Sequence, residues 1–370
     1  MNGSKINFMK FIVPIRQKIV IRNADTKNGT DVIQYNSGED NARFILYKVD
    51  GDNYLIVNKN SGKLVVVYNS DPGNDVGIKQ WDSESGNGRW HFVKNGGNSY
   101  LIRSNMSGKL AVIENGSKNN AALIVQYDQQ SVGNGEWEFH PVESFTMPTL
   151  PELKPQPSSP VYSESGGEGQ AMPDTSEKAV VAATLFPAVM VRNNSWSLST
   201  QMRYSPYYIL EKQQYWKKVV NLSFAPGESK TTTYKYGMRE TDQTTMHNTI
   251  SMTVGMDSGV NIEGVTESMK GEITNSLEIT ESHTTELMKD YDETITISNP
   301  FQKQSMQYAK YILTTEFVLK RTDGSVADSW SMTDNNTVHT TSYPRMSEDT
   351  RFTIESQSNS QSCNNSKPCK

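Results

Sequence analysis

Residues 54–81 read YLIVNKNSGKLVVVYNSDPGNDVGIKQW, and residues 100–127 read YLIRSNMSGKLAVIENGSKNNAALIVQY, so one pattern returns after 46 positions. Its end occurs three times at this spacing, as Gln34-Tyr35, Gln80-Trp81 and Gln126-Tyr127. A further echo follows each pair: Asn41-Ala42-Arg43-Phe44, Asn87-Gly88-Arg89-Trp90 and Asn134-Gly135-Glu136-Trp137. Counting back places a degenerate first copy of the opening segment at Phe11 to Ile19. The first third of the chain therefore consists of three copies of one unit.

Each unit is too small to bury an apolar face by itself, so the three copies must share one core. The pattern resembles the β-trefoil of the ricin-B lectin type, over residues 9–143. We therefore expect an N-terminal β-trefoil lectin domain within residues 1–143.

The resemblance also implies sugar sites, in which an aromatic ring stacks on the sugar while an Asn and an early Asp bind its hydroxyls. The matching aromatic and Asn positions are Tyr35, Asn41, Trp81, Asn87, Tyr127 and Asn134. The early Asp is missing, because its positions fall at about Ile21, Val66 and Val112. Asp25, Asp71 or Glu114 in the next loop could substitute for it. The alternative is a trefoil kept as a scaffold or docking surface, with Trp90 and Trp137 simply in the core.

Composition narrows the class of the whole chain. Its 370 residues suffice for two or three domains. Abundant Gly, Asn, Ser and Thr, without helical heptads, favour an all-β fold. The net charge of −5 and the lack of a basic cluster argue against a nucleic-acid partner. No apolar run approaches the ~18 residues of a transmembrane helix.

Cysteine and the chain start add two expectations. The two cysteines, Cys363 and Cys369, stand in the last eight residues, so we expect no disulfide and no thiol metal site in the folded body. No metal or other cofactor is implied. Met1 to Val13 has no clear small-residue cleavage site, which makes it a poor signal peptide.

Residues 144–178 mark a boundary, since five prolines between Pro148 and Pro160 are followed by Gly166-Gly167-Glu168-Gly169. A Pro-rich and then Gly-rich segment is typical of a connection between domains, stiff and then flexible. The alternative is a packed, extended segment lying across the second domain.

Residues 231–298 read as one long β system, with 15 Thr, 6 Ser and no Pro, Cys, Phe or Trp. Period-two alternation predicts two amphipathic strands. The apolar positions of the first are Ile250, Met252, Val254, Met256, Val260 and Ile262, and those of the second are Ile273, Leu277 and Ile279. Each run could match the roughly 9–11 residues of a transmembrane β-strand. The plainer interpretation is a half-buried hairpin of an ordinary β-domain. Further strands are expected at 231–236, 291–298 and 311–320.

Several blocks of the second domain resemble the Bin-like insecticidal crystal toxins of spore-forming bacilli, over residues 179–345. These blocks are Thr184 to Val191, Ser205 to Trp216, Glu316 to Gly324 and Ser342-Tyr343-Pro344. The resemblance implies an elongated antiparallel β-sheet pore-forming domain of aerolysin type. It also implies oligomerisation, insertion of a hairpin spanning 249–285 into the target-cell membrane, deposition as crystals during sporulation, and action in the insect gut. Some members need a second toxin component and others act alone.

Charge and proteolysis give the remaining site expectations. Residues 249–285 carry six acidic residues against the single base Lys270, and we expect Asp257, Glu272 and Glu278 to face a pore lumen and favour cations. The Ser/Asn-rich tail, 346–370, is a plausible propeptide, as is Met1 to Lys10. Lys10, Arg345 and Arg351 are the expected trypsin-like cleavage sites.

An enzyme is not indicated, because the five histidines lack a metal-ligand spacing and no phosphate loop or nucleophile elbow occurs. Carboxylates such as Glu263, Glu267, Glu272 and Glu278 stand in a Thr/Ser-rich run without nearby Trp, unlike a glycosidase site. The alternative to the toxin is a lectin fused to a β-rich carbohydrate-active or adhesion domain.

Overall fold

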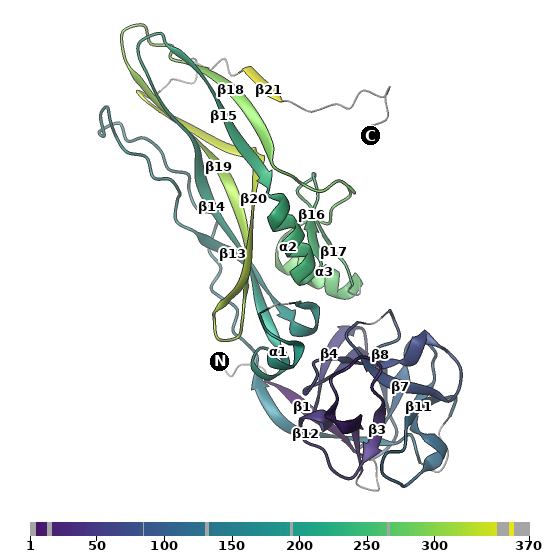
Figure 1. Ribbon diagram of the computed structural model, residues 1–370. Helices are drawn as coiled ribbons and strands as arrows, with labels where there is room; N and C mark the ends of the chain where they lie inside the picture. Colours follow the sequence, from purple (N-terminus) through teal and green to yellow (C-terminus); the bar gives the residue numbers. More distant parts are fainter. Residues whose placement is uncertain are drawn as a thin grey trace, which may run out of the picture.

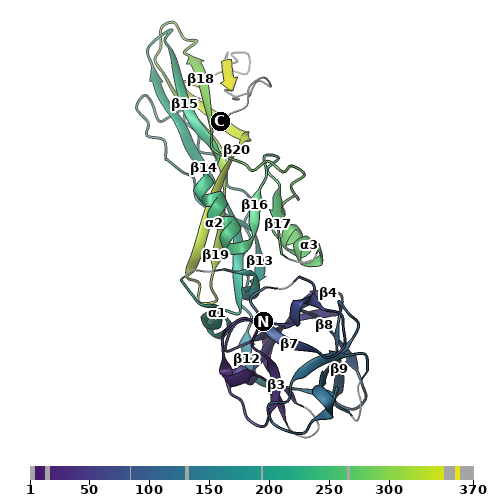
Figure 2. The same cartoon turned by 45° about the vertical axis from the view of Figure 1, so that its right-hand side comes forward.

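The computed structural model describes residues 5–12, 17–83, 85–129, 133–192, 195–264, 267–345 and 355–358. A compact barrel of short strands lies at one end, and an elongated sheet domain extends away from it (Figures 1 and 2). The predicted fold class is confirmed, both the β-trefoil inferred from the repeat and the elongated antiparallel β-sheet domain implied by the Bin-like resemblance.

The trefoil is built from short antiparallel strands, each unit contributing a similar set. Its strands are β1 (Lys5–Ile12), β2 (Lys18–Ile21), β3 (Val32–Tyr35), β4 (Phe44–Asp50), β5 (Asn53–Asn58), β6 (Leu64–Val67), β7 (Val76–Trp81), β8 (Arg89–Lys94), β9 (Ser99–Ser104), β10 (Leu110–Ile113), β11 (Ile124–Tyr127) and β12 (Trp137–Thr146). The 3-10 turns are η1 (Arg22–Ala24), η2 (Asp40–Ala42), η3 (Tyr68–Ser70) and η4 (Glu114–Gly116). Strand β1 closes the barrel by pairing with β12.

The repeat explains the trefoil core. Phe44, Trp90 and Trp137 are the equivalent aromatic residues of the three units, and each is 0% exposed in one apolar cluster. The two indoles are also satisfied, because Trp90 Nε1 donates to Val65 O at 2.8 Å and Trp137 Nε1 donates to Ala111 O at 3.0 Å. Both Trp residues are therefore core, as both interpretations of the sequence allowed.

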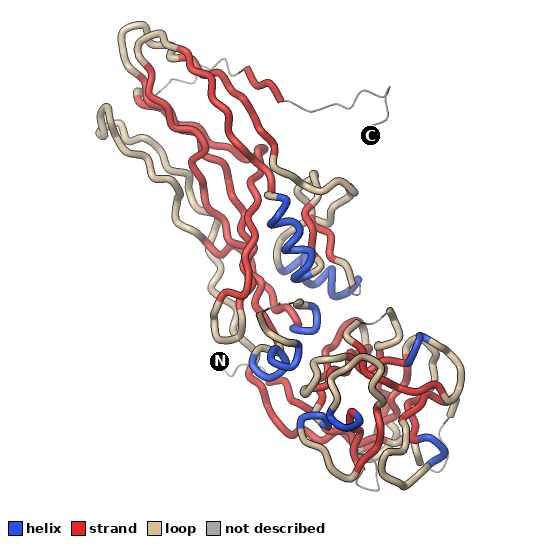
Figure 3. Tube along the Cα trace, in the orientation of Figure 1, coloured by secondary structure: helices blue, strands red, loops and turns tan. Residues whose placement is uncertain are grey.

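The second domain is one long antiparallel sheet with a small helical insertion (Figure 3). Its sheet runs in the order β13 (Ala179–Pro187), β14 (Tyr207–Phe224), β19 (Met306–Lys320), β20 (Val326–Tyr343), β15 (Ser229–Met238), β18 (Tyr291–Ser298) and β21 (Glu355–Ser358). The smaller elements are η5 (Ala188–Met190), α1 (Leu198–Tyr204), α2 (Glu240–Ile250), β16 (Met252–Val254), β17 (Val260–Ile262) and α3 (Glu267–Ser276). The strands expected at 231–236, 291–298 and 311–320 are confirmed as parts of β15, β18 and β19.

At the end far from the trefoil, the β15–β18 pair packs over β14 and β19. Ile295 and Ile297 of β18 are 0% exposed in a cluster with Phe224 and Met306. The opposite face of the pair carries hydroxyls that bond across the strands, at 2.7 Å for Ser229–Ser298, 2.8 Å for Thr231–Thr296 and 2.9 Å for Thr233–Thr294. The pair is thus an amphipathic ribbon with one apolar and one hydroxyl face.

Residues 147–178 contain no helix or strand, yet they lie along the second domain. Trp216 Nε1 donates to Pro157 O at 2.8 Å, and Tyr162 and Met172 are each 6% exposed against the sheet. Thr175 forms an isolated bridge with Lys217. The expectation of a flexible connection is therefore wrong for this stretch, and the packed, extended alternative describes it.

The trefoil docks on the second domain through a shared core. Its trefoil members are Ile45, Tyr47, Val49, Leu55, Val57, Leu64 and Val66. They pack with buried second-domain residues such as Phe186 and Tyr208. The Tyr47 hydroxyl donates to Pro206 O at 2.7 Å. Gly62 has φ +69°, and a Cβ there would lie 2.4 Å from Leu198 Cβ, so only glycine fits this turn against α1.

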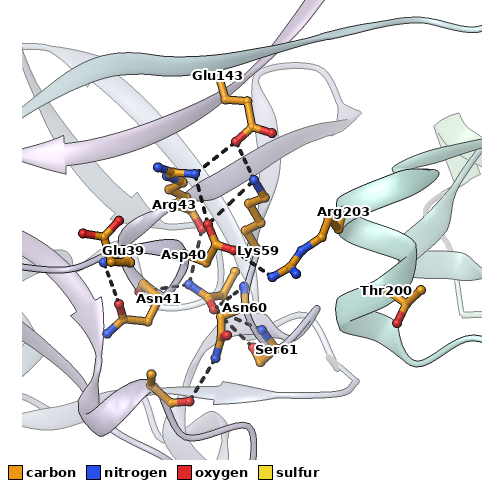
Figure 4. Close-up of polar contacts among 12 residues, drawn as sticks. Glu39, Asp40, Asn41, Arg43, Lys59, Asn60, Ser61, Glu143, Thr200 and Arg203 are labelled. Carbon is orange, nitrogen blue, oxygen red and sulfur yellow. Dashed lines mark hydrogen bonds and ion pairs between the residues drawn. The ribbon is translucent and has the colours of Figure 1, made fainter.

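Ion pairs flank the shared core (Figure 4). Asp40 of η2 pairs with Arg43 at 3.0 Å and with Arg203 of α1 at 2.8 Å. Arg43 lies 3.2 Å from Glu143, which also pairs with Lys59. Because most of these side chains are partly exposed, each pair contributes at most about 1 kcal/mol. Apolar burial therefore carries most of the docking.

Candidate functional site

The glutamine that precedes each candidate aromatic residue links two trefoil units by side-chain hydrogen bonds. Gln80 Nε2 donates to Asp25 O at 2.8 Å and Lys27 O at 2.9 Å, in the preceding unit. Gln34 and Gln126 repeat this bond pattern onto the 117–119 and 71–73 loops. All three are at most 1% exposed. Each Gln side chain therefore connects neighbouring units. The aromatic residue that follows it takes no part in these bonds.

The three candidate asparagines support loops. Asn41 Nδ2 donates to Ile21 O at 3.0 Å, Asn87 Nδ2 to Val67 O at 2.7 Å and Asn134 Nδ2 to Ile113 O at 2.8 Å. Asn41 and Asn87 also accept a backbone N–H through Oδ1, from Glu39 and Ser85. These bonds use part of each amide, so sugar binding at the Asn positions stays a prediction.

The loop acids expected to replace the missing Asp hold turns as well. Asp25 Oδ1 accepts the Lys27 N–H at 3.0 Å, and Asp71 Oδ1 accepts the Gly73 N–H at 2.8 Å. Glu114 begins η4. Val66 and Val112, at two of the missing-Asp positions, are 2% and 3% exposed. The Asp positions of a family-like galactose pocket are therefore apolar and buried here, and the substitution of Asp25, Asp71 or Glu114 for that Asp stays a prediction.

The three aromatic candidates have different surroundings. Tyr35 and Tyr127 are each 37% exposed, whereas Trp81 packs against the shared core. Trp81 lines an open pocket of about 300 Å³ in the second unit, together with Val66, Tyr68, Asn69, Ser70, Ser83, Ser85 and Asn87. The Tyr68 and Trp81 ring centroids lie 6.5 Å apart at 51°. We call this the Trp81 pocket; it brings one predicted aromatic residue and one predicted Asn together with hydroxyls.

Tyr68 was missed at the sequence level. It starts η3, and its equivalents 46 positions away are Arg22 and Glu114, neither of which is aromatic. The repeat alignment contained this signal, because Tyr68 makes the second unit the one with two aromatic rings near its candidate site.

Residues 239–290, which we call the insertion module, connect β15 to β18. Their predicted apolar positions are mostly buried, between 0% and 4% exposed for Ile250, Met252, Val254, Val260, Ile262, Ile273 and Leu277. Ile279 packs against the shared core, whereas Met256 is 46% exposed. The module thus buries most of its predicted apolar side chains against the trefoil and the long sheet.

The two predicted continuous strands are wrong in this fold. The first run forms the end of α2 and the short β16–β17 hairpin, which turns where Gly255 N–H donates to Gly259 O at 2.8 Å. Ser258 there has φ +58°. The second run lies in and just after helix α3, because Met269, Ile273 and Leu277 are spaced by four residues and line one helical face.

Residues 179–345 match the family described as "Insecticidal Crystal Toxin, P42", and residues 18–81 match "Ricin-type beta-trefoil lectin domain-like". The insecticidal crystal toxin match thus covers the second domain as far as Arg345. Below, residues 179–345 are called the crystal-toxin domain, after the family that they match. The Bin-like and ricin-B-like resemblances inferred from the sequence are confirmed.

Relatives agree with this assignment. Insecticidal crystal protein Cry35Ab1 of Bacillus thuringiensis is 31% identical over 221 residues, which cover 57% of this chain and 56% of that protein. Binary larvicide subunit BinA of Lysinibacillus sphaericus is 31% identical over 201 residues, covering 54% and 53%. The chain thus spans about half the length of the curated relatives it matches. The crystal structure of Cry35Ab1 superposes with a TM-score of 0.73 and 27% identity, covering 92% of this chain and 90% of that one.

Within the crystal-toxin domain, the three predicted lumen acids lie apart. Asp257 accepts the His283 N–H at 2.7 Å, a bond that holds the pKa of its carboxyl below the usual value. Glu272 lines a pocket beside Tyr207, whose pKa rises to about 12, mainly through burial and secondarily through Glu272. The Glu278 carbonyl accepts a bond from Lys212 Nζ at 2.9 Å. Their lumen role stays a prediction.

The predicted cleavage sites also differ. Lys10 lies inside β1, paired with His140 of β12, so a protease reaches it only after that strand opens. Arg345 is exposed and lies 3.5 Å from Glu164. Arg351, Cys363 and Cys369 fall outside the described residues.

Three further observations concern metal binding, membrane-spanning helices and enzyme families. The described part of the chain contains no group of three or more His, Cys, Asp or Glu side chains placed to hold a metal ion. None of the helices in the described ranges is long and apolar enough to cross a membrane. The two matching families are a toxin family and a lectin-like domain family, and neither is an enzyme family.

Proposed function

We propose that this chain is an insecticidal toxin that binds a surface glycan or glycoprotein receptor through its trefoil, oligomerises, and inserts residues 249–285 into the target-cell membrane as a β-hairpin. The observation that carries the proposal is the position of the insertion module. It joins the two strands of the amphipathic β15–β18 ribbon and keeps its own apolar residues buried. Unfolding of the module would therefore lengthen both strands of an existing ribbon.

The ribbon supports a barrel in particular. Strands span lipid only in a closed barrel, because each backbone polar group must be paired. The β15–β18 register is continuous from Ser229↔Ser298 to Tyr236↔Tyr291, so the two strands already form a ready-made hairpin stem. Repeated around a ring of protomers, such stems would close and leave no free edge.

The partners follow from the trefoil and the relatives. A receptor-bound trefoil raises the local protomer concentration and so favours oligomerisation by mass action. The relatives named as binary larvicide subunits support a second toxin component, and the relative named as an insecticidal crystal protein supports a crystal inclusion and an insect target. Production by a spore-forming bacterium and action at the insect midgut membrane are part of the proposal.

The tail is proposed as the activation segment. Its strand β21 pairs with the outer edge of β18, from Glu293↔Ser358 to Thr296↔Glu355. Trimming at Arg345 or Arg351 would remove β21 and expose a sheet edge that another protomer can pair with.

An engineered disulfide tests insertion. Thr249 Oγ1 of the module lies 3.4 Å from Asp328 Oδ2 of β20, so Thr249→Cys with Asp328→Cys ties the module to the sheet. With Cys363 and Cys369 replaced by Ser, we expect the bridged protein to bind midgut vesicles but release less than a tenth as much trapped dye as the reduced protein.

The control bridge joins strands that stay paired in both states. Thr231→Cys with Thr296→Cys crosses the β15–β18 stem, where the hydroxyls are 2.8 Å apart. This bridge is expected to leave dye release unchanged before and after reduction. Full release by the bridged Thr249/Asp328 variant, with the bridge verified by mass, would sink the insertion mechanism.

A further inference from the structure

The three trefoil units face different surroundings, and the second unit, together with β4 at the end of the first, faces the crystal-toxin domain. Leu64 and Trp81 are direct cross-strand partners in β6 and β7, so their side chains share one face of the sheet. Leu64 is a member of the shared core, and the Trp81 ring packs against that core. Tyr127, the equivalent of Trp81 in the third unit, is instead 37% exposed.

The chain just after Trp81 lies between two pockets. Ser83 lines the Trp81 pocket and also a pocket of about 140 Å³ between the domains. Asp82 lines the second pocket too, opposite Ile250, Ser251, Glu263 and Gly264 of the insertion module. A group that fills the Trp81 pocket therefore lies next to the segment that lines the second pocket together with the module.

Arg192 makes the connection through hydrogen bonds. Its guanidinium Nη2 donates to Asp82 O at 3.2 Å, and its backbone N–H donates to Thr249 O at 2.7 Å. Thr249 lies in the last turn of α2, so Arg192 connects the 81–83 segment to the end of that helix.

The connected end of α2 is also the start of the hairpin that has to unfold. Ser251 has φ +51° and ends α2 in the left-handed region. Its carbonyl accepts the Glu263 N–H at 2.9 Å and so closes the base of the β16–β17 hairpin. A shift of the 81–83 segment would therefore act on the closing bond of the hairpin.

We propose that the second trefoil unit is a sensing site, whose occupancy by a glycan at Trp81 is transmitted through Asp82 and Arg192 to the α2–β16 junction and loosens the insertion module. This inference rests on the proposed function, of which it names the regulation. The first and third units then serve attachment only. Because coupling between two sites is reciprocal, release of the module also changes the affinity of the Trp81 pocket for its glycan.

The coupling is tested without a ligand, by hydrogen exchange of the full chain in solution. Trp81→Ala removes the wall between the pocket and the shared core, and Arg192→Ala removes the bond to Asp82. Each is expected to raise the exchange rate of the 249–264 amides about tenfold, while the β10 and β11 amides keep their protection. Arg192 is exposed, so its variant is expected to fold.

Tyr127→Ala is the matched control, because it removes the equivalent ring of the third unit. It is expected to leave exchange at 249–264 within twofold of the parent. Equal rates in the parent, Trp81→Ala and Arg192→Ala proteins would overturn the sensing role, as would an equal rise in Tyr127→Ala. No membrane is present in this measurement, so its failure leaves the dye-release test of pore formation standing, and the reverse also holds.

Discussion

At the scale of single residues, a buried polar cluster joins the β15–β18 ribbon to the rest of the sheet. The Tyr234 hydroxyl can donate its one proton to Asn335 Oδ1, at 2.7 Å, or to the Glu293 carboxylate, and its oxygen accepts from Lys310 Nζ. Lys310 is 6% exposed, and burial lowers its pKa, an effect that Glu293 opposes. The cluster therefore joins the buried Lys310 ammonium to the partly exposed Glu293 carboxylate through one shared phenol.

Tyr234→Phe should destabilise the protein by about 2–3 kcal/mol, because it leaves the buried Lys310 ammonium and the partly exposed Glu293 carboxylate with one hydrogen bond fewer each. Urea unfolding measures the change. Tyr236→Phe, two residues along the same strand, is the control. Tyr236 stacks on Tyr291 with ring centroids 5.5 Å apart, and its ring is kept by the substitution, so a change within about 0.5 kcal/mol is expected. Similar losses in both variants would contradict the role of the cluster.

At the scale of elements, α3 is the clearest difference between prediction and structure, because the sequence pattern predicted a strand where the chain forms a helix. Ile273 and Leu277 are four residues apart, a spacing that suits a helix as well as alternate positions of a strand. Burial against the trefoil strand β4 selects the helix, and that neighbour is visible only in the folded chain. The long strands β15, β18 and β19 were predictable because Thr, Ile, Val and Tyr are frequent in them. The trefoil was predictable because one sequence pattern returns at a spacing of 46 residues.

Gly271 provides a test of the helix. It lies inside α3, and a Cβ added there would meet no atom within 4 Å. Gly271→Ala should therefore raise the free energy of unfolding by about 0.5–1 kcal/mol, through helix propensity. It should also slow dye release, because α3 must unfold for insertion. Thermal unfolding and vesicle leakage are the two measurements.

Gly264→Ala is the opposite case, because Gly264 has φ +70° and a side chain there is strained. It should lower stability by about 1 kcal/mol and speed release. If Gly271→Ala lowered stability instead, α3 would not be the helix of the soluble form.

At the scale of the whole molecule, buried tyrosines predict a loss of stability at alkaline pH. Burial raises the pKa of Tyr47, Tyr207, Tyr234, Tyr308 and Tyr311, to about 12 for Tyr207 and Tyr311. Above about pH 10 these phenols ionise in the unfolded chain while the folded chain keeps their protons. Ionisation therefore stabilises the unfolded state, and the free energy of unfolding falls with rising pH. The lowered pKa values of Lys212 and Lys310 act in the opposite direction, but only up to about pH 10.5.

The loss should therefore be steepest between about pH 10.5 and 12, and Tyr207→Phe should reduce it. Tyr207 lies between the domains and next to Glu272 of the insertion module, so its ionisation would place a second negative charge there. Removing that phenol should recover about 2 kcal/mol at pH 12 relative to pH 9, since each unit of pKa shift is worth about 1.4 kcal/mol. Urea unfolding at stepped pH measures this difference. Tyr35→Phe, at an exposed trefoil position, should leave the pH dependence unchanged. Equal slopes for the parent and Tyr207→Phe would exclude the Tyr207 phenol as a source of the alkaline weakness.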